Sequence, residues 1–309
     1  MNKTSNSWAM TLVIGCAILW GTVGVTTRGI YTVSETNALS IGFYRLLFSV
    51  PLLGALAVRS VGPNLLQQRT GVVGGRGRDL ALMIGLGAMM AFYQVAYFAA
   101  IPRLGVTIAV IVTICSAPIM VAVISAVFLK ETLTPRVIAA LVAAVGGTAL
   151  LALQQPTGAI ATDQAGWGIV FALASGFGYA MLTFFSRALA DRYHPLQPIT
   201  IGFAVGAVLL FPIALASGLT LSYPGEGWGL LVYLGVVPTA LAYWLFLLAL
   251  RTVPATVSSI LTLLEPLVGA LLAAAFFHET LTPLGWAGAA LLLGALVILL
   301  VRWEPAKGI

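Results

Sequence analysis

Long apolar blocks separated by short polar segments dominate the chain. Each block is about 20 residues long, the length that an α-helix needs to cross the hydrocarbon core of a bilayer. Polar and apolar residues do not alternate within the blocks, as they would in the strands of a membrane β-barrel. The pattern therefore predicts ten membrane-spanning helices, at residues 8–28, 37–58, 80–101, 104–129, 136–154, 166–187, 196–217, 228–250, 253–277 and 284–302.

Few residues in the chain are charged. Hydrophobic residues make up 60% of the 309 positions and charged residues only 8%, whereas a soluble domain has about 25% charged residues. This composition cannot cover a soluble surface, which excludes a soluble enzyme, a nucleic-acid-binding protein and a disordered regulator. Cys16 and Cys115 fall inside predicted spans, so we expect small buried side chains and neither a disulfide nor a metal site. The expected fold class is all-α integral membrane.

The net charge of +6 indicates how the spans are oriented. If the N-terminus is cytoplasmic, the segments on that side hold most of the cations: Lys3, Arg59, Arg69, Arg76, Arg78, Lys130, Arg136, Arg187, Arg192, Arg251, Arg302 and Lys307. The segments on the other side hold Arg28 and Arg103. Cytoplasmic loops of membrane proteins carry an excess of lysine and arginine. We therefore expect both termini and the 59–79 loop to be cytoplasmic, in the inner membrane of a bacterium.

The sequence contains an internal repeat. The hexapeptide Lys130–Pro135 returns, with one change, as His278–Pro283 at an offset of 148 residues. This predicts two halves of five spans each, at residues 1–155 and 156–309. Because five is odd, the second half must cross the membrane upside down relative to the first. Inverted repeats are a common architecture of transporters, with the substrate site near the middle of the membrane between the halves.

Several loose motifs occur in a fixed order within this repeated frame. They are Trp20-Gly21 in the first span, Tyr44-Arg45 followed by Pro51 in the second, and a proline-containing fourth span that ends in Glu-Thr-Leu-Thr. In these features the whole chain resembles the EamA branch of the drug/metabolite transporter superfamily, and within it the YddG-type bacterial amino-acid exporters. The resemblance implies a pocket lined by spans one to four and six to nine, with spans five and ten packed outside it.

Two spans carry an ionisable residue at depth, Arg45 in span two and Glu265 in span nine. Charges are costly in lipid, so both are expected to face the bundle interior. Ser258, Thr262 and Glu265 have the spacing of one helix face, which is a candidate cavity wall. Glu265 is a candidate to bind a substrate amine or to carry a proton, and the alternative is a structural carboxyl beside a kink. Arg45 is a candidate to hold a substrate carboxylate, and the alternative is that it snorkels or pairs with Glu265 or Glu35.

Aromatic side chains are plentiful in the predicted spans. The candidates for a binding pocket are Trp20, Tyr93, Gln94, Tyr97, Tyr179, Tyr243 and Trp244. Tyr93 and Tyr97 share a helix face, and Trp20 matches Tyr179 across the repeat. Rings with polar tips suit an amino acid with a large side chain. For each of these residues the alternative is packing in the core or against lipid.

Prolines inside spans are candidate gates. A proline removes a backbone hydrogen bond and bends a helix, and a bend can serve either as a gate or as a static kink. The candidates are Pro51, Pro118, Pro212 and Pro266. Pro118 and Pro266 are mates in the repeat, but Ala117 precedes the first and Glu265 the second. The role of Glu265 is therefore not a scaffold that both halves share.

The function that we expect is secondary transport. The chain would export amino acids, aromatic or other large neutral ones, from the cytoplasm by alternating access, either passively or coupled to protons. A carrier of another metabolite or drug with the same fold is the first alternative. A membrane-embedded enzyme is the second, and it is disfavoured because His194 and His278 lie at span ends. We expect no catalytic residue, no metal and no cofactor. The expected partners are the amino-acid substrate and the lipid bilayer, with no nucleic acid, and a monomer is compatible with the sequence.

Overall fold

The computed structural model describes residues 3–66, 75–153, 164–277 and 281–300, and the regular structure in these segments is helical. The helices are Lys3–Val33 (α1), Ala38–Val61 (α2), Arg76–Leu104 (α3), Val106–Phe128 (α4), Pro135–Leu153 (α5), Ala165–Leu189 (α6), Leu196–Ala216 (α7), Gly225–Gly235 (α8), Val236–Leu241 (η2), Ala242–Ala249 (α9), Ala255–Leu261 (α10), Leu264–Phe277 (α11) and Pro283–Leu300 (α12). Ten stretches are long and apolar enough to cross a membrane. Each overlaps one predicted span, so the predicted all-α membrane fold is confirmed.

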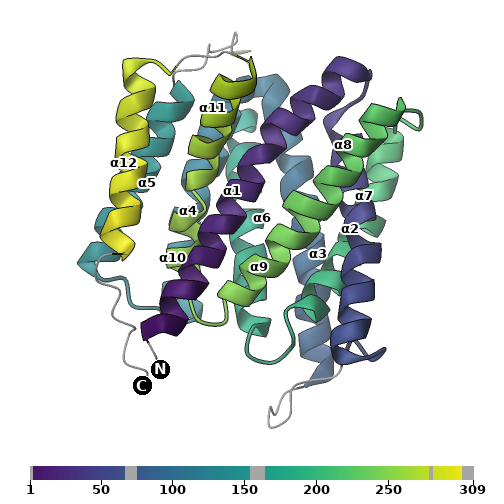
Figure 1. Cartoon of the computed structure of the whole chain (residues 1–309), viewed down its shortest axis with the longest axis horizontal. Helices are drawn as coiled ribbons and strands as arrows, with labels where there is room; N and C mark the ends of the chain where they lie inside the picture. The colour runs from purple at the N-terminus through teal and green to yellow at the C-terminus, as the bar shows by residue number, and fades with distance from the viewer. Residues whose placement is uncertain (1–2, 67–74, 154–163, 278–280, 301–309) are drawn as a thin grey trace.

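The ten spans form two sets of five, α1–α5 and α6–α12, that cross in opposite directions. The start of α1 and the end of α12 consequently lie at the same end of the bundle (Figure 1). We call this end the terminal end, and the opposite end the distal end. The helices extend further into polar sequence than the apolar pattern predicts: α1 covers Lys3–Val33 rather than 8–28, and α3 begins at Arg76 rather than 80.

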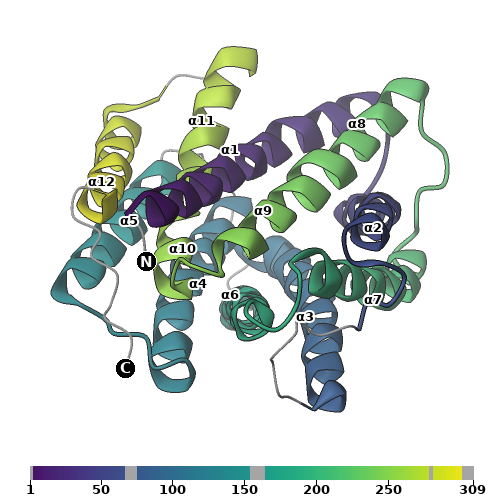
Figure 2. The same cartoon turned by 60° about the horizontal axis from the view of Figure 1, so that its bottom comes forward.

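Spans five and ten lie outside the rest of the bundle, as expected. Helices α5 and α12 pack against each other at one edge, far from α2 and α7 at the opposite edge (Figures 1 and 2). Their backbones cross closely at two glycines, since a Cβ atom on Gly147 would lie 2.7 Å from the Gly288 carbonyl oxygen. Small residues at a crossing allow the close van der Waals packing that holds helices together in lipid.

Two spans are interrupted in the middle, and each interruption involves a proline. In span eight, the π-helical segment η2 separates α8 from α9 and contains Pro238. In span nine, α10 ends at Leu261 and α11 begins at Leu264, so Pro266 lies in the first turn of α11. A proline is tolerated in a first helical turn, where its missing N–H has no helical partner.

The other candidate gating prolines do not interrupt their helices. Pro51, Pro118 and Pro212 lie inside α2, α4 and α7, and each helix continues through its proline. Pro118 and Pro266 are mates in the repeat, yet only Pro266 follows a break. The two halves therefore share a topology but differ at this position.

At the terminal end, Glu131 joins the two halves. Helix α4 ends in a Schellman-type turn in which Lys130 adopts a positive φ of 55° and the Glu131 N–H donates to the Ser125 carbonyl oxygen at 3.1 Å. The turn places the Glu131 carboxylate at the start of α10. There it accepts the N–H groups of Ala255 at 2.7 Å and Thr256 at 3.1 Å, and the Thr256 hydroxyl at 2.8 Å. These bonds satisfy amide groups that have no partner within α10.

Replacement of Glu131 by alanine should destabilise the protein. The change leaves two N–H groups at the start of α10 without their acceptor, and loss of a helix cap costs about 1–2 kcal/mol. The measurement is the free energy of unfolding of the purified protein in a denaturant titration. Asp191→Asn is the matched control, because the Asp191 side chain is 70% exposed and its ion-pair partner among the described residues is Arg187, one turn away. That pair is expected to contribute less than about 0.5 kcal/mol, and equal losses for the two variants would contradict the role of Glu131.

Candidate functional site

A cavity of about 860 Å³ lies between the two halves, within the size range of small-molecule sites. Its walls come from α1, α2, α3, α4, α6 and α9 and from the junction of α10 with α11. Among the lining residues, Trp20 lies near the middle of α1 and Tyr243 lies at the start of α9, in the terminal half of span eight, whereas Tyr31 and Ala38 lie near the distal ends of α1 and α2. The cavity therefore extends from the middle of the bundle to the distal end.

Trp20 and Tyr243 line the inner end of the cavity, and Phe246 and Phe203 pack behind them. The Trp20 ring lies 4.8 Å from the Tyr243 ring and 5.4 Å from the Phe246 ring, and Phe203 lies 5.1 Å from Tyr243. All four side chains are buried. Tilted and edge-to-face rings of this kind pack densely. We call these four residues the aromatic floor; Phe203 and Phe246 lie in the terminal halves of their spans.

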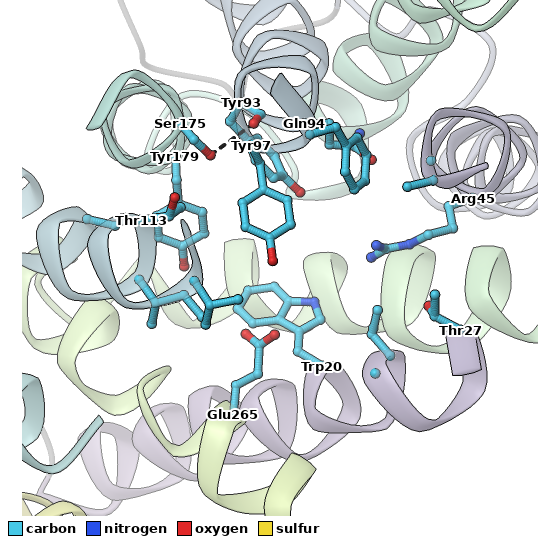
Figure 3. A pocket seen from close by; sticks show the side chains of 18 of the residues that line it. Trp20, Thr27, Arg45, Tyr93, Gln94, Tyr97, Thr113, Ser175, Tyr179 and Glu265 are labelled. Carbon is cyan, nitrogen blue, oxygen red and sulfur yellow. Dashed lines mark hydrogen bonds between the residues drawn. The ribbon is translucent and has the colours of Figure 1, made fainter. Parts of the chain in front are cut away.

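Glu265 lies at the break in span nine, in the first turn of α11. The carbonyl oxygen of Thr262 would accept the N–H of residue 266 in a continuous helix, but Pro266 has none, and the Glu265 N–H donates to Thr262 instead at 2.9 Å. The turn directs the carboxylate into the cavity (Figure 3). The partial positive charge at the start of a helix favours an acidic side chain in this position.

A glycine in α1 allows α11 to carry Glu265 to this place. A Cβ atom on Gly21 would lie 2.6 Å from the Val268 side chain and 3.1 Å from the Glu265 carbonyl oxygen. Any larger residue at position 21 would push α11 away from α1. In the Trp20-Gly21 pair, the Trp20 ring lines the cavity and Gly21 allows the close approach of α11.

Arg45 extends from α2 into the cavity on another wall (Figure 3). Its Nε–H donates to the Thr239 hydroxyl oxygen at 3.2 Å. Within the described part of the chain, this is the one hydrogen bond of the Arg45 side chain, and no ion pair links Arg45 to Glu265. The alternative in which Arg45 pairs with Glu265 or Glu35 is therefore not found among the described residues. An arginine and a glutamate side chain thus face the same cavity without a direct bond between them.

Tyrosines occupy the wall between these two charges. Tyr93 and Tyr179 meet edge to face with their ring centroids 6.5 Å apart, and Tyr97 points into the cavity one helical turn after Tyr93 (Figure 3). The Ser175 hydroxyl donates to the Tyr93 carbonyl oxygen at 2.9 Å and ties α6 to α3 at this level. Gln94 is buried and donates to the Met90 carbonyl oxygen at 3.3 Å.

The cavity collects most of the residues that the sequence singled out. The predicted binding residues that line it are Trp20, Arg45, Tyr93, Gln94, Tyr97, Tyr179, Tyr243, Thr262 and Glu265. Of the candidate gating prolines, Pro118 also lines it, whereas Pro51, Pro212 and Pro266 do not.

Two predicted binding residues lie away from the cavity. Ser258 is fully buried in α10. The regular helix ends before Thr262, so Ser258 and Glu265 do not share the helix face that the sequence predicted. Trp244 follows Tyr243 in α9, and one step along a helix turns its side chain away from the cavity into packing with the core. Span seven also departs from the expectation, because α7 packs on α2 and α3 and lines no part of the cavity.

Some lining residues were not predicted. Thr27, Thr113 and Ser175 add hydroxyl groups to the walls, and the sequence gives them no signal that distinguishes them from other polar residues in spans. Thr239 does not line the cavity but holds Arg45. Its signal was available, since Pro238-Thr239 places a proline in the middle of span eight.

Comparison with known proteins assigns the chain to a family. Residues 7–153 and 166–301 match the EamA-like transporter family. The uncharacterized transporter YwfM of Bacillus subtilis (strain 168) is 30% identical over 93% of this chain and 92% of its own. A protein of Streptantibioticus cattleyicolor named probable terminal-alkyne amino-acid exporter is 28% identical over 77% of this chain and 79% of its own.

A solved crystal structure has the same fold. It superposes with a TM-score of 0.79 over 96% of this chain and 97% of that chain, at 18% sequence identity. Each of the two stretches that match the family holds five of the ten spans, as two inverted repeats require. The chain therefore belongs to the EamA-like transporter family and is a multi-pass membrane transporter.

Proposed function

We propose that this transporter exports amino acids, with aromatic or other large neutral ones as its substrates. The observation that carries the proposal is that a basic and an acidic side chain, Arg45 and Glu265, line one cavity and make no direct bond with each other. An amino acid carries a carboxylate and an ammonium group, which complement these two side chains. The guanidinium can hold a carboxylate through two parallel hydrogen bonds, and the Glu265 carboxylate can accept from the ammonium group.

The aromatic walls favour substrates with large side chains. Trp20, Tyr93, Tyr97 and Tyr179 present ring surface to the cavity, and apolar area that a ligand buries contributes about 25 cal/mol per Å². The name of the Streptantibioticus relative, an amino-acid exporter, adds support from outside this chain. The transport unit that we propose is a monomer.

The cation distribution supports a bacterial inner-membrane protein with cytoplasmic termini. In this orientation the cavity, which extends to the distal end, faces outward, and the aromatic floor closes the path to the cytoplasm. Export by alternating access then requires a second state in which the floor opens and the distal walls close. In the outward-facing state the substrate leaves.

The topology can be tested with two single cysteines. Asn64 follows α2 at the terminal end and Ser222 precedes α8 at the distal end, and both are exposed. With a membrane-impermeant maleimide applied to intact cells, Ser222→Cys should be labelled and Asn64→Cys should not. The wild-type protein gives the background from Cys16 and Cys115, which lie inside α1 and α4. Labelling of Asn64→Cys from outside would reverse the orientation and with it the direction of transport.

Glu265→Gln should weaken amino-acid binding at every pH. The amide cannot form the charge-assisted hydrogen bond to the ammonium group, a loss of about 1.5–3 kcal/mol or roughly tenfold or more in affinity. The measurement is the concentration dependence of amino-acid efflux from proteoliposomes, with a panel of labelled amino acids. Glu226→Gln, an exposed carboxyl at the start of α8, is the matched control and should behave as wild type.

Other outcomes of this experiment separate the alternatives for Glu265. A variant that exchanges substrate normally but no longer responds to a pH gradient would identify a proton carrier. Normal efflux and normal pH dependence in a folded variant would leave Glu265 a structural role only. If the wild-type protein transports no amino acid in the panel, the proposed function is wrong.

Trp20→Ala should reduce the affinity for large substrates more than for small ones. The substitution removes ring surface from the cavity floor, and loss of the contact should cost a phenylalanine-sized side chain about 1–3 kcal/mol and an alanine-sized one little. The measurement is competition of amino acids of graded size in the efflux assay. Trp20→Phe keeps a ring against Tyr243 and should give an intermediate result. Equal losses for all sizes would contradict contact between Trp20 and the substrate side chain.

A further inference from the structure

The π-helical segment in span eight contains an unusual pair of hydrogen bonds. In a continuous α-helix the carbonyl oxygen of Leu234 would accept the N–H of residue 238, but Pro238 has no N–H. The Thr239 hydroxyl donates to the Leu234 oxygen instead, at 2.6 Å. Inserted π turns of this kind occur often at functional sites.

This bond fixes the role of the Thr239 hydroxyl. A hydroxyl group has one proton and two lone pairs, and here the proton is committed to Leu234. The group can therefore only accept from Arg45, whose Nε–H points at it from 3.2 Å. Thr239 is fully buried, so water does not compete for this lone pair.

The backbones of the two helices approach closely at the same level. A Cβ atom on Gly235, the last residue of α8, would lie 3.1 Å from the Arg45 carbonyl oxygen and 2.6 Å from the Phe48 Cβ. Only glycine leaves room for this approach. The crossing brings Thr239 within reach of Arg45 while the two remaining nitrogens of the guanidinium extend toward the cavity (Figure 3).

We infer that Pro238 and Thr239 form a positioning element that holds the guanidinium of Arg45 in the orientation that binds a substrate carboxylate. The contact to Nε occupies one edge of the guanidinium and leaves the two Nη groups, a pair of donors in a fixed fork, for a carboxylate. Thr239 itself does not touch the substrate. The inference rests on the proposed function in one respect, the carboxylate as the ligand of Arg45.

The first half of the repeat has no such element. At the offset of 148 residues, Met90 and Ala91 stand at the places of Pro238 and Thr239, and α3 is continuous through them. A requirement of the fold would apply to both halves. The Pro238-Thr239 element occurs in the half that contacts Arg45 and is absent from the equivalent helix α3. This favours a role in the candidate site over a role in the scaffold.

The test uses two substitutions of Thr239 and a matched control. Thr239→Val keeps the shape but removes the acceptor, and Thr239→Ser keeps the hydroxyl. Thr183→Val is the matched control. It removes another fully buried hydroxyl, which donates to the Tyr179 carbonyl oxygen at 3.0 Å, and Thr183 does not line the cavity.

For an amino acid that the wild type transports, Thr239→Val should raise KM about tenfold, the cost of one hydrogen bond to a charged group. The maximal rate per folded molecule should stay near wild type, and Thr239→Ser and Thr183→Val should retain the wild-type KM.

A ligand that lacks the carboxylate separates positioning from general damage. The binding of the decarboxylated amine should be the same in Thr239→Val and in the wild type. Equal losses for the amino acid and the amine would overturn the inference, because they would indicate a distorted cavity. Should Thr239→Val fail to fold, Thr239→Ala provides the same loss of the acceptor.

A structure of the variant tests the positioning without any substrate. In Thr239→Val the guanidinium of Arg45 should leave its place, whereas in Thr183→Val it should not. An unchanged Arg45 in the Thr239→Val structure would overturn the inference. If the wild type binds no amino acid, the proposed function fails, and this structural comparison still decides whether Thr239 positions Arg45.

Discussion

A backbone carbonyl inside a membrane must find its hydrogen-bond donor within the protein, because the hydrocarbon offers none. Pro238 and Pro266 each remove the donor of a carbonyl in the middle of a span. For Leu234 the replacement is the Thr239 hydroxyl, and for Thr262 it is the Glu265 N–H. The bond to Leu234 orients the Thr239 hydroxyl, which accepts from Arg45. The bond to Thr262 belongs to the turn that directs Glu265 toward the cavity. The two charges of the site are thus placed by the way the chain repairs two missing backbone bonds.

Placing both charges in one cavity without a direct bond has an energetic consequence. A buried ion pair would offset much of the cost of desolvating Arg45 and Glu265, and the described residues form no such pair. The start of α11 and the Thr239 hydroxyl each stabilise one charge in part, and the opening of the cavity at the distal end admits water. A ligand with both charges satisfies the two side chains together, whereas a neutral ligand would displace this water without replacing its hydrogen bonds.

The sequence was sufficient for the parts of the structure that follow a regular period. The ten spans, their division into two halves and the depth of Arg45 and Glu265 follow from apolar blocks, a repeated hexapeptide and rare charges. Nine of the eleven predicted binding residues line the cavity, because polar and aromatic residues at mid-span have few other places to face. Which residues bind substrate stays a prediction.

The failures came where the helical period stops. Ser258 was placed on the face of Glu265 by counting along a helix that the structure breaks at Thr262. Trp244 was a candidate because it is an aromatic residue inside a span, and its helix turns it toward the core. Span seven was expected at the pocket from resemblance alone, but α7 packs behind α2 and α3. The bond from Arg45 to Thr239 joins residues 194 positions apart, and no local pattern encodes a contact over that distance. A proline next to a threonine in mid-span is nevertheless a signal, because it marks a carbonyl that needs a new donor.

The equivalent spans four and nine of the two halves have different surroundings at the two ends of the bundle. At the terminal end, Glu131 in the turn after α4 caps α10. Span four is thereby joined to span nine, its equivalent in the other half. At the distal end, the first half of α4 lines the cavity instead. This chain breaks the symmetry at span nine and at η2, where one half has irregular turns and the other a continuous helix. Arg45 and Glu265 lie beside these two irregular turns, so the departure from symmetry is concentrated at the candidate site.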